Sequence, residues 1–194
     1  LVVKLKGPRR QSAPCARARV PETEPLKEAW HALLASGEDD LGFYFEVADF
    51  LAGKDQKPLA SELLLAAGKH CADAGQAGAG LEILKKIVAI FPAEAGLREL
   101  LVEAYQGAFP GTEQLEFFLK KSGLTEEEKI VRCLPRLDTF LSFRQGGYVF
   151  HGGGWGLGRI TSVDYPLDSM TVDFVTKPGH QMTLSVAAEV LKAL

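Results

Sequence analysis

Features typical of secreted, membrane-spanning and fibrous proteins are missing from this sequence of 194 residues. Its three cysteines, Cys15, Cys71 and Cys133, include no Cys-x-x-Cys pair, which argues against a disulfide framework and against a clustered zinc site. No apolar run approaches the ~20 residues that a membrane span needs. Ten prolines and twenty glycines are too few for a collagenous or wholly disordered chain. We therefore predict a cytoplasmic protein with no membrane partner.

Common catalytic signatures are missing as well. The chain contains no Gly-x-Ser-x-Gly nucleophile elbow and no His-Glu-x-x-His zinc motif, and no cysteine has a plausible base beside it in the sequence. We therefore expect a protein that is not an enzyme and that holds no cofactor or metal. One alternative stays open, because His151 and His180 both lie in the C-terminal region and could form a general-base or zinc site.

The net charge of -3 is distributed unevenly along the chain. Residues 1–20 hold six basic and no acidic residues, residues 21–143 hold twelve basic and twenty-one acidic residues, and residues 144–194 hold four of each. Because acidic regions repel phosphate, non-specific nucleic-acid binding would have to come from the N-terminal tail. We predict that residues 1–22 form a disordered basic tail, and we favour a solvated extension or cloning artefact over a transit peptide or nucleic-acid arm.

Apolar residues recur at helical spacing in residues 23–143, which we predict to be an α-helical domain. Leu26, Ala29 and Trp30, for example, step by i, i+3 and i+4. Glycines follow where several of these stripes end, as they do at helix C-termini. The stripes predict helices at residues 24–36, 40–52, 57–74, 77–91, 94–108, 112–122 and 125–141.

Two details refine the prediction for the last helix. Thr125 and Glu128 have the spacing of a capping box, which predicts the N-terminus of this helix. Pro135 predicts that the helix kinks or splits.

Short loops between amphipathic helices predict a stack of helix pairs similar to a tetratricopeptide (TPR) array. Such an array could bind a second protein or act as a spacer.

The periodicity changes in residues 144–194, which carry short β-branched segments separated by turn-forming residues. Ile160 and Val163 are out of step with a period of two, which predicts a bulge. Segments this short cannot form two stacked layers, so we predict a small closed barrel and an α+β multidomain fold. The predicted strands are Tyr148–His151, 157–164, 170–174 and 181–184.

The glycine-rich segment of residues 151–158 is the most distinctive motif. A phosphate-binding loop needs a helix N-terminus after its glycines, whereas a strand-like sequence follows here. We therefore expect these glycines to serve backbone geometry, with Trp155 closing the end of the barrel. The residues of this structural motif are His151, Gly154, Trp155, Gly156 and Gly158.

The same motif belongs to a longer spaced pattern of glycine, aromatic and β-branched residues. It consists of Gly147-Tyr148-Val149-Phe150-His151, Trp155-Gly156-Leu157-Gly158-Arg159-Ile160, Val163-Asp164 and Val172-Asp173-Phe174. This pattern resembles the Tudor/SH3-like RNA polymerase-interaction modules of bacteria, namely the CarD and transcription-repair coupling factor domain and the C-terminal Tudor domain of UvrD/PcrA helicases. Together with residues 177–184 and the helical region, it is similar to the N-terminal extension of long GreA-type transcript cleavage factors.

The resemblance implies an adaptor that docks on RNA polymerase. No acidic coiled coil of the kind that carries GreA cleavage chemistry is present, so that activity is not implied. The resemblance suggests Trp155, Arg159, Lys177 and His180 as partner-facing residues, although core packing is the alternative for Trp155. Two other functions stay open, a small-barrel nucleic-acid binder that uses the basic tail and a histidine- or metal-dependent enzyme.

Overall fold

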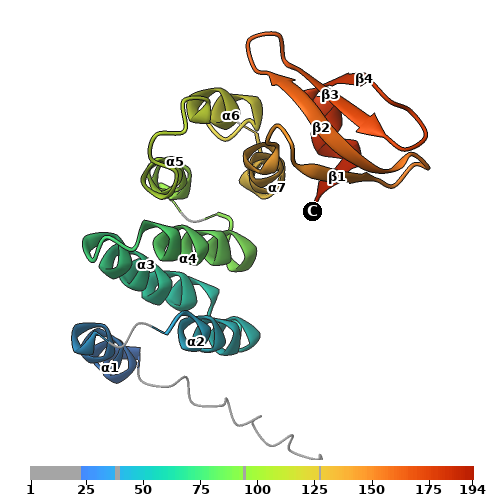
Figure 1. Cartoon of the computed structure of the whole chain (residues 1–194). Coiled ribbons are helices and arrows are strands. Elements are labelled where there is room, and N and C mark those ends of the chain that lie inside the picture. The colour runs from blue at the N-terminus through green and yellow to red at the C-terminus, as the bar shows by residue number, and fades with distance from the viewer. Residues whose placement is uncertain (1–22, 38–39, 94, 127) are drawn as a thin grey trace, which may run out of the picture.

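Helices come first along the chain and an antiparallel sheet follows, as the computed structural model shows (Figure 1). The structure describes residues 23–37, 40–93, 95–126 and 128–194, so the predictions for the N-terminal tail and Cys15 lie outside the described residues. The predicted α+β order is confirmed. Before the sheet come α1 (Thr23–Ser36), α2 (Leu41–Gly53), α3 (Lys57–Asp73), α4 (Ala77–Ile90), α5 (Leu97–Ala108), α6 (Leu115–Lys121) and α7 (Ile130–Ser142).

The predicted start of the last helix is wrong. Helix α7 begins after Lys129, and the expected capping box of Thr125 and Glu128 lies outside it. Arg98 explains the difference, because its guanidinium donates to the carbonyl oxygens of Gly123 at 3.2 Å and of Glu128. These bonds hold the preceding backbone in turns, in which the Glu126 N–H donates to the Gly123 carbonyl oxygen at 3.1 Å. Helix α7 then continues through Pro135 without splitting.

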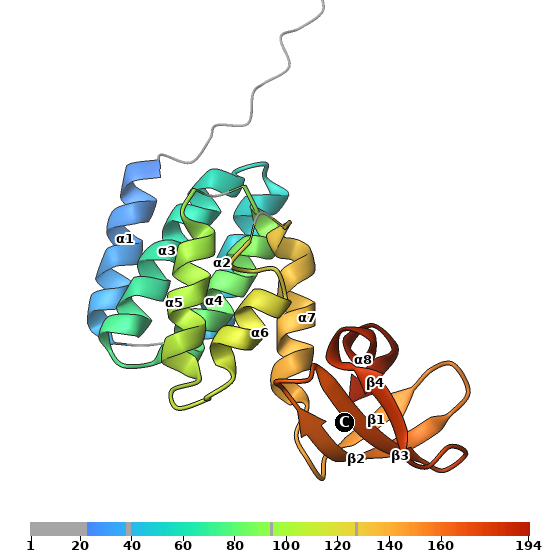
Figure 2. The same cartoon turned by 90° about the horizontal axis from the view of Figure 1, so that it is seen from above.

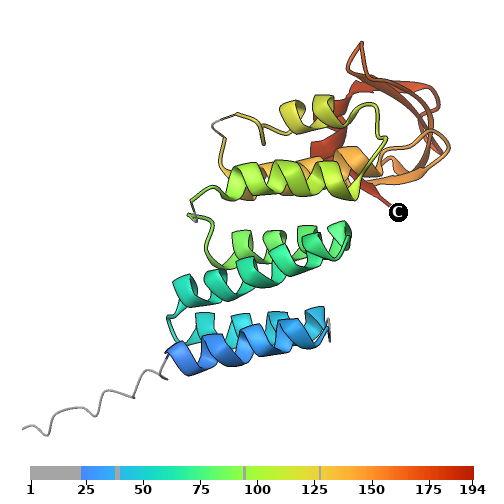
Figure 3. The same ribbon diagram turned by 90° about the vertical axis from the view of Figure 1, so that its left-hand side faces the viewer.

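The helices lie side by side in successive layers, which Figure 3 shows from the edge. Helix α3 packs against α2 and α4, and α4 packs in turn against α5 and α7. Gly68 and Gly80 lie where α3 and α4 meet, and a Cβ atom at Gly80 would lie 3.5 Å from the carbonyl oxygen of Gly68. Leu64, Ile87 and Leu101 are fully buried between the layers.

The sheet is open, which corrects the predicted closed barrel. Its strand order is β4-β3-β2-β1-β5, so β4 and β5 are free edges. All neighbouring strands are antiparallel, and a register shift between Ile160 and Ser162 confirms the predicted bulge in β2. The strands are β1 (Tyr148–His151), β2 (Gly156–Asp164), β3 (Ser169–Phe174), β4 (His180–Thr183) and β5 (Leu191–Ala193).

A short helix, α8 (Leu184–Val190), replaces the end of the last predicted strand. Met182, Leu184 and Val186 alternate with polar residues as in a strand, yet of these three only Met182 lies in one. The side chain of Thr183 caps the helix by accepting a hydrogen bond from the Val186 backbone N–H at 3.2 Å. Leu184 and Ala187 are buried on the face of α8 that covers the sheet. The inner face of the sheet is closed by this helix and not by further strands.

The helices and the sheet share one continuous core (Figure 2). Helix α7 packs against α8 and β5, and the ring of Phe118 lies 5.9 Å from that of Phe140 and 5.3 Å from that of Tyr165. Lys121 of α6 forms an ion pair with Asp168 in the β2–β3 turn. The short connection after α7 is also fixed, because the Gly146 N–H donates to the Ile160 carbonyl oxygen at 2.8 Å. The sheet therefore has a set orientation on the helices.

Among the described residues, no helix combines the length and the apolar character needed to cross a bilayer.

Candidate partner-binding surfaces of the sheet

The glycine-rich loop between β1 and β2 has a backbone that side chains would obstruct. Gly154 and Gly156 have positive φ angles of 103° and 70°, which L-residues rarely adopt. A Cβ atom at Gly153 would lie 2.6 Å from the imidazole of His151. Strand β2 starts at Gly156, so the loop leads into a strand and not into a helix N-terminus that could bind phosphate.

Gly158 makes room for an aromatic ring inside the sheet. It pairs with Val149 on one side and with Phe174 on the other. A Cβ atom at Gly158 would lie 2.5 Å from the Phe174 ring and 2.7 Å from Val172, closer than real carbon atoms approach. Glycine is therefore required here so that Phe174 can fold back across β2.

The Phe174 ring supports a cluster around Trp155 at the open end of the inner face. His151 stacks on the indole with 4.3 Å between ring centroids, and His180 meets it edge-on at 4.4 Å. The Lys177 ammonium lies 4.4 Å from the indole centroid, at a distance suited to a cation–π contact. Three of the four residues predicted to face a partner, Trp155, Lys177 and His180, therefore lie together.

The cluster also shifts the pKa of His180. The pKa of His180 lies below the ordinary value of about 6.5, mainly because burial disfavours the charged ring and also because Lys177 and His151 repel it. Below pH ~6.5, His180 therefore binds a proton more readily in the unfolded chain than in the folded chain. Acidification from that pH toward the lowered pKa therefore weakens the folded cluster.

We expect an NMR titration to find the His180 midpoint below that of an unfolded peptide. Replacing Lys177 with methionine removes one repelling charge, so the pKa of His180 should rise relative to the unmodified chain. The matched control is Lys192→Met on the outer face of the sheet, which should leave the His180 midpoint unchanged. An unchanged His180 midpoint in the Lys177 variant would show that Lys177 does not act on this ring.

His151 and His180, the pair named in the enzyme alternative, are brought together through Trp155. The indole ring packs against both of them. Within the described ranges, no group of three or more histidine, cysteine, aspartate or glutamate side chains is placed to hold a metal ion.

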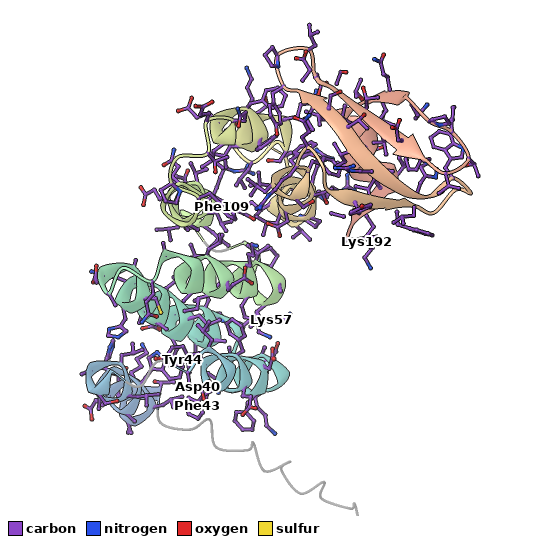
Figure 4. All side chains as sticks on the ribbon, viewed as in Figure 1. Asp40, Phe43, Tyr44, Lys57, Phe109 and Lys192 are labelled. Atoms are coloured by element: carbon purple, nitrogen blue, oxygen red, sulfur yellow. The ribbon has the colours of Figure 1, made fainter. Side chains whose placement is uncertain are left out.

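The outer face of the sheet carries a second surface, to which Arg159 belongs. Tyr148, Phe150 and Leu157 are exposed by 53%, 47% and 45%. Cross-strand register places Phe150 opposite Leu157 and Tyr148 opposite Arg159, so their side chains share this face. Figure 4 shows Lys192, which pairs with Phe150 from β5, projecting away from the sheet.

The apolar part of this outer face was not predicted from the sequence. Strand β1 has three apolar residues in succession, Tyr148, Val149 and Phe150. Only Val149 of these three is buried. A strand with apolar residues on both faces predicts either burial on both sides or an uncovered apolar surface. That signal was available in the sequence.

Comparison with known proteins relates this chain to bacterial proteins that carry the GreA name. It is 26% identical over 170 residues, 87% of this chain, to the GreA-associated domains protein of Treponema pallidum (strain Nichols). It is 30% identical over 115 residues, 59% of this chain, to transcription elongation factor GreA of Borreliella burgdorferi. Transcription elongation factor GreA of Chlamydia trachomatis is 34% identical over 56 residues, 29% of this chain.

The aligned segments are small parts of these relatives. They cover 25% of the Treponema protein, 12% of the Borreliella protein and 8% of the Chlamydia protein. No family model matches the chain. No solved structure matches it either. The chain is thus related in sequence to GreA-named proteins.

Proposed function

We propose that this chain is a non-catalytic adaptor of the transcription machinery, which docks on RNA polymerase through the outer face of its sheet. We place it in the N-terminal region of a GreA-like elongation factor. The names of the relatives support a role in transcription elongation. The observation that carries the docking surface is the exposed apolar patch of Tyr148, Phe150 and Leu157 on β1 and β2.

This patch has the composition of a protein-binding surface. Two aromatic side chains and a leucine lie side by side, and aromatic residues supply much of the binding energy in protein interfaces. Arg159 and Lys192 lie on the same face, and Asp173 pairs with Arg159 from β3. An apolar centre with a charged rim excludes water at the centre and selects the partner at the rim.

The edges of the sheet give a second route to the same partner. Strands β4 and β5 each have one neighbour, which leaves backbone donors and acceptors along their outer sides. A partner strand added at either edge would gain register from the backbone and selectivity from side chains. We regard the sheet as an open form of a Tudor/SH3-like module.

The helical region would then act as an arm that carries or positions a second protein. Its layered helix pairs support a TPR-like arrangement, in which each layer contacts mainly its neighbours. The cluster of Trp155, Lys177 and His180 lies on the inner side of the sheet, away from the outer patch. We assign it to shaping the β1–β2 loop.

Point substitutions test this function better than deletion of the sheet, which would uncover the shared core. In a pull-down with purified bacterial RNA polymerase, Phe150→Asp should reduce recovery about tenfold or more, because an interface aromatic residue is worth roughly 1.4 kcal/mol or more. The matched control is Leu167→Asp, which changes a 75% exposed leucine in the β2–β3 turn.

Recovery of the control variant should equal that of the unmodified chain. Equal recovery of the Phe150 variant and the unmodified chain would reject the outer face as the docking surface. Loss of binding in both variants would show that the partner does not distinguish the patch from other exposed apolar residues.

Single-stranded nucleic acid is the second candidate, because the same outer face presents Tyr148 and Phe150 beside Arg159 and Lys192. Aromatic rings on a sheet can stack on bases while basic side chains contact phosphates. This function predicts an affinity that falls steeply with salt. Docking through apolar contacts predicts a weak dependence on salt. Fluorescence anisotropy with a labelled oligonucleotide at several salt concentrations separates the two.

A further inference from the structure

The first helix pair exposes an apolar groove at the end of the helical stack opposite the sheet. Tyr44, Ala48 and Leu51 of α2 are buried, Leu51 at the edge of the groove, whereas Phe43 and Phe50 are 44% and 62% exposed. Leu26 of α1 and Val47 form the floor between them, and the groove has a volume of about 390 Å³. Helix α2 is therefore apolar on two faces, and one of them has no covering element among the described residues.

The exposed face has a regular pattern along α2. Phe43, Val47 and Phe50 follow one another at i, i+4 and i+7, and Lys54 continues the row with its ammonium 5.6 Å from the Phe50 ring centroid. Such a row is the surface that a helix presents to another helix. The buried residues of α2 make the same kind of contact with α3.

Opposite charges stand at the two ends of this row. Asp40 precedes α2 and caps it, and Lys54, Asp55 and Lys57 follow its last turn, which leaves that end with one net positive charge. Figure 4 shows Asp40 and Phe43 close together and Lys57 apart from them. The sequence adds two acids, Glu38 and Asp39, immediately before Asp40. The acidic end and the basic end are separated by the length of the helix.

We infer that this groove binds a second copy of the chain, with the two α2 helices antiparallel across a two-fold axis. An axis between Glu46 and Val47 places Phe43 of each copy opposite Phe50 of the other. The same operation brings Asp40 of each copy beside Lys54 of the other. In the antiparallel orientation, the apolar row of one copy therefore matches the apolar row of the other, and the charged ends of one copy face opposite charges on the other.

A parallel arrangement of the two α2 helices would not use both features together. In a parallel pair, Asp40 would face Asp40 and Lys54 would face Lys54, which is repulsive at both ends. The charge pattern thus selects the antiparallel dimer. Glu46 lies beside the axis and opposes the contact, so Glu46→Gln should tighten the dimer.

Sedimentation equilibrium of the full chain from about 1 μM to about 1 mM tests the dimer across the range of ordinary protein affinities. Phe50→Glu should raise the dissociation constant about a hundredfold, because two buried phenylalanines are lost for each dimer. The matched control Val131→Glu changes a 54% exposed valine on α7 and should leave the constant unchanged. Circular dichroism checks that each variant keeps its helices.

A charge exchange then identifies the orientation. Asp40→Lys and Lys54→Asp should each weaken self-association about tenfold or more, since each variant places like charges at both ends. An equimolar mixture of the two variants restores both pairs, and its dissociation constant should return to about that of the unmodified chain. Recovery in the mixture is expected even if loss of the Asp40 cap lowers the stability of α2.

Three results would overturn the proposal. A monomer at every concentration would leave the groove to a different protein or to residues of this chain outside the described ranges. A dimer that Phe50→Glu does not weaken would use another surface, such as the sheet. Variants that weaken the dimer separately and do not recover when mixed would exclude the antiparallel orientation.

Discussion

Replacing Phe140 with alanine should lower the free energy of unfolding of the whole chain by about 3–5 kcal/mol, the usual cost of removing a buried phenylalanine ring. Phe140 is fully buried on α7, and its ring stacks on that of Phe118, which also contacts Tyr165 of the sheet. The cavity would therefore open between the helices and the sheet. Filling this cavity would require the helices or the sheet to shift from their present packing.

Urea unfolding followed by circular dichroism measures this loss, and the NMR signals of His151 and His180 report on the sheet in the same samples. We expect the helical signal and the sheet signal to shift together, because both parts share the core. The matched control is Val131→Ala on the exposed side of the same helix, which should change stability by about 0.5 kcal/mol or less. A shift of the helical signal alone would contradict the shared core.

Substitution of Gly158 by alanine should destabilise the chain by about 3 kcal/mol, at the upper end of overpacking costs. The added methyl group would lie 2.5 Å from the Phe174 ring and 2.7 Å from Val172, and both of these side chains are buried. Phe174 would have to leave its place, and Trp155 would then lose a neighbour at 5.5 Å. The effect therefore extends to the β1–β2 loop.

Gly152→Ala is the matched control for this substitution. A Cβ atom at Gly152 has no neighbour within 4 Å, and its backbone is not in the left-handed region. The control should unfold at the same urea concentration as the unmodified chain, whereas the Gly158 variant should unfold earlier and show altered fluorescence from Trp155. Equal midpoints for the two variants would mean that Phe174 can be repacked at little cost.

Much of the fold follows from local patterns in the sequence. The long stripes of α3 and α4 predict helix limits within a residue of those observed, because both helices are amphipathic and a helix-ending residue follows each, Gly75 after α3 and Pro92 after α4. The strands β1, β2 and β3 and the bulge in β2 also follow from period-two alternation and its interruption. These features depend on residues that are close together in the chain.

Features that depend on distant residues could not be predicted in this way. The start of α7 is set by Arg98, which lies far earlier in the sequence and binds the carbonyl oxygen of Glu128. The closed barrel was an inference from the number of strands. In the structure, α8 covers the inner face, and β5 pairs with β1.

The candidate sites show the same division between local and distant information. The grouping of Trp155, Lys177 and His180 matches one predicted set of residues, because the β1–β2 loop and the β3–β4 turn lie at the same end of the sheet. Arg159 lies in β2, on the opposite face of the sheet. Which face of a short sheet stays uncovered depends on where α7 and α8 pack, and no local pattern specifies that.

The bonded connection between α7 and β1 has a geometric consequence for any molecule that the chain holds. Gly146 and Gly147 are tied to Ile160 by backbone hydrogen bonds of 2.8 and 2.9 Å, so no flexible tether separates α7 from the sheet. Two copies joined at α2 would carry their sheets outward at a fixed span. A target with two matching docking points at that span would gain avidity, whereas targets with other spacings would engage one sheet at a time.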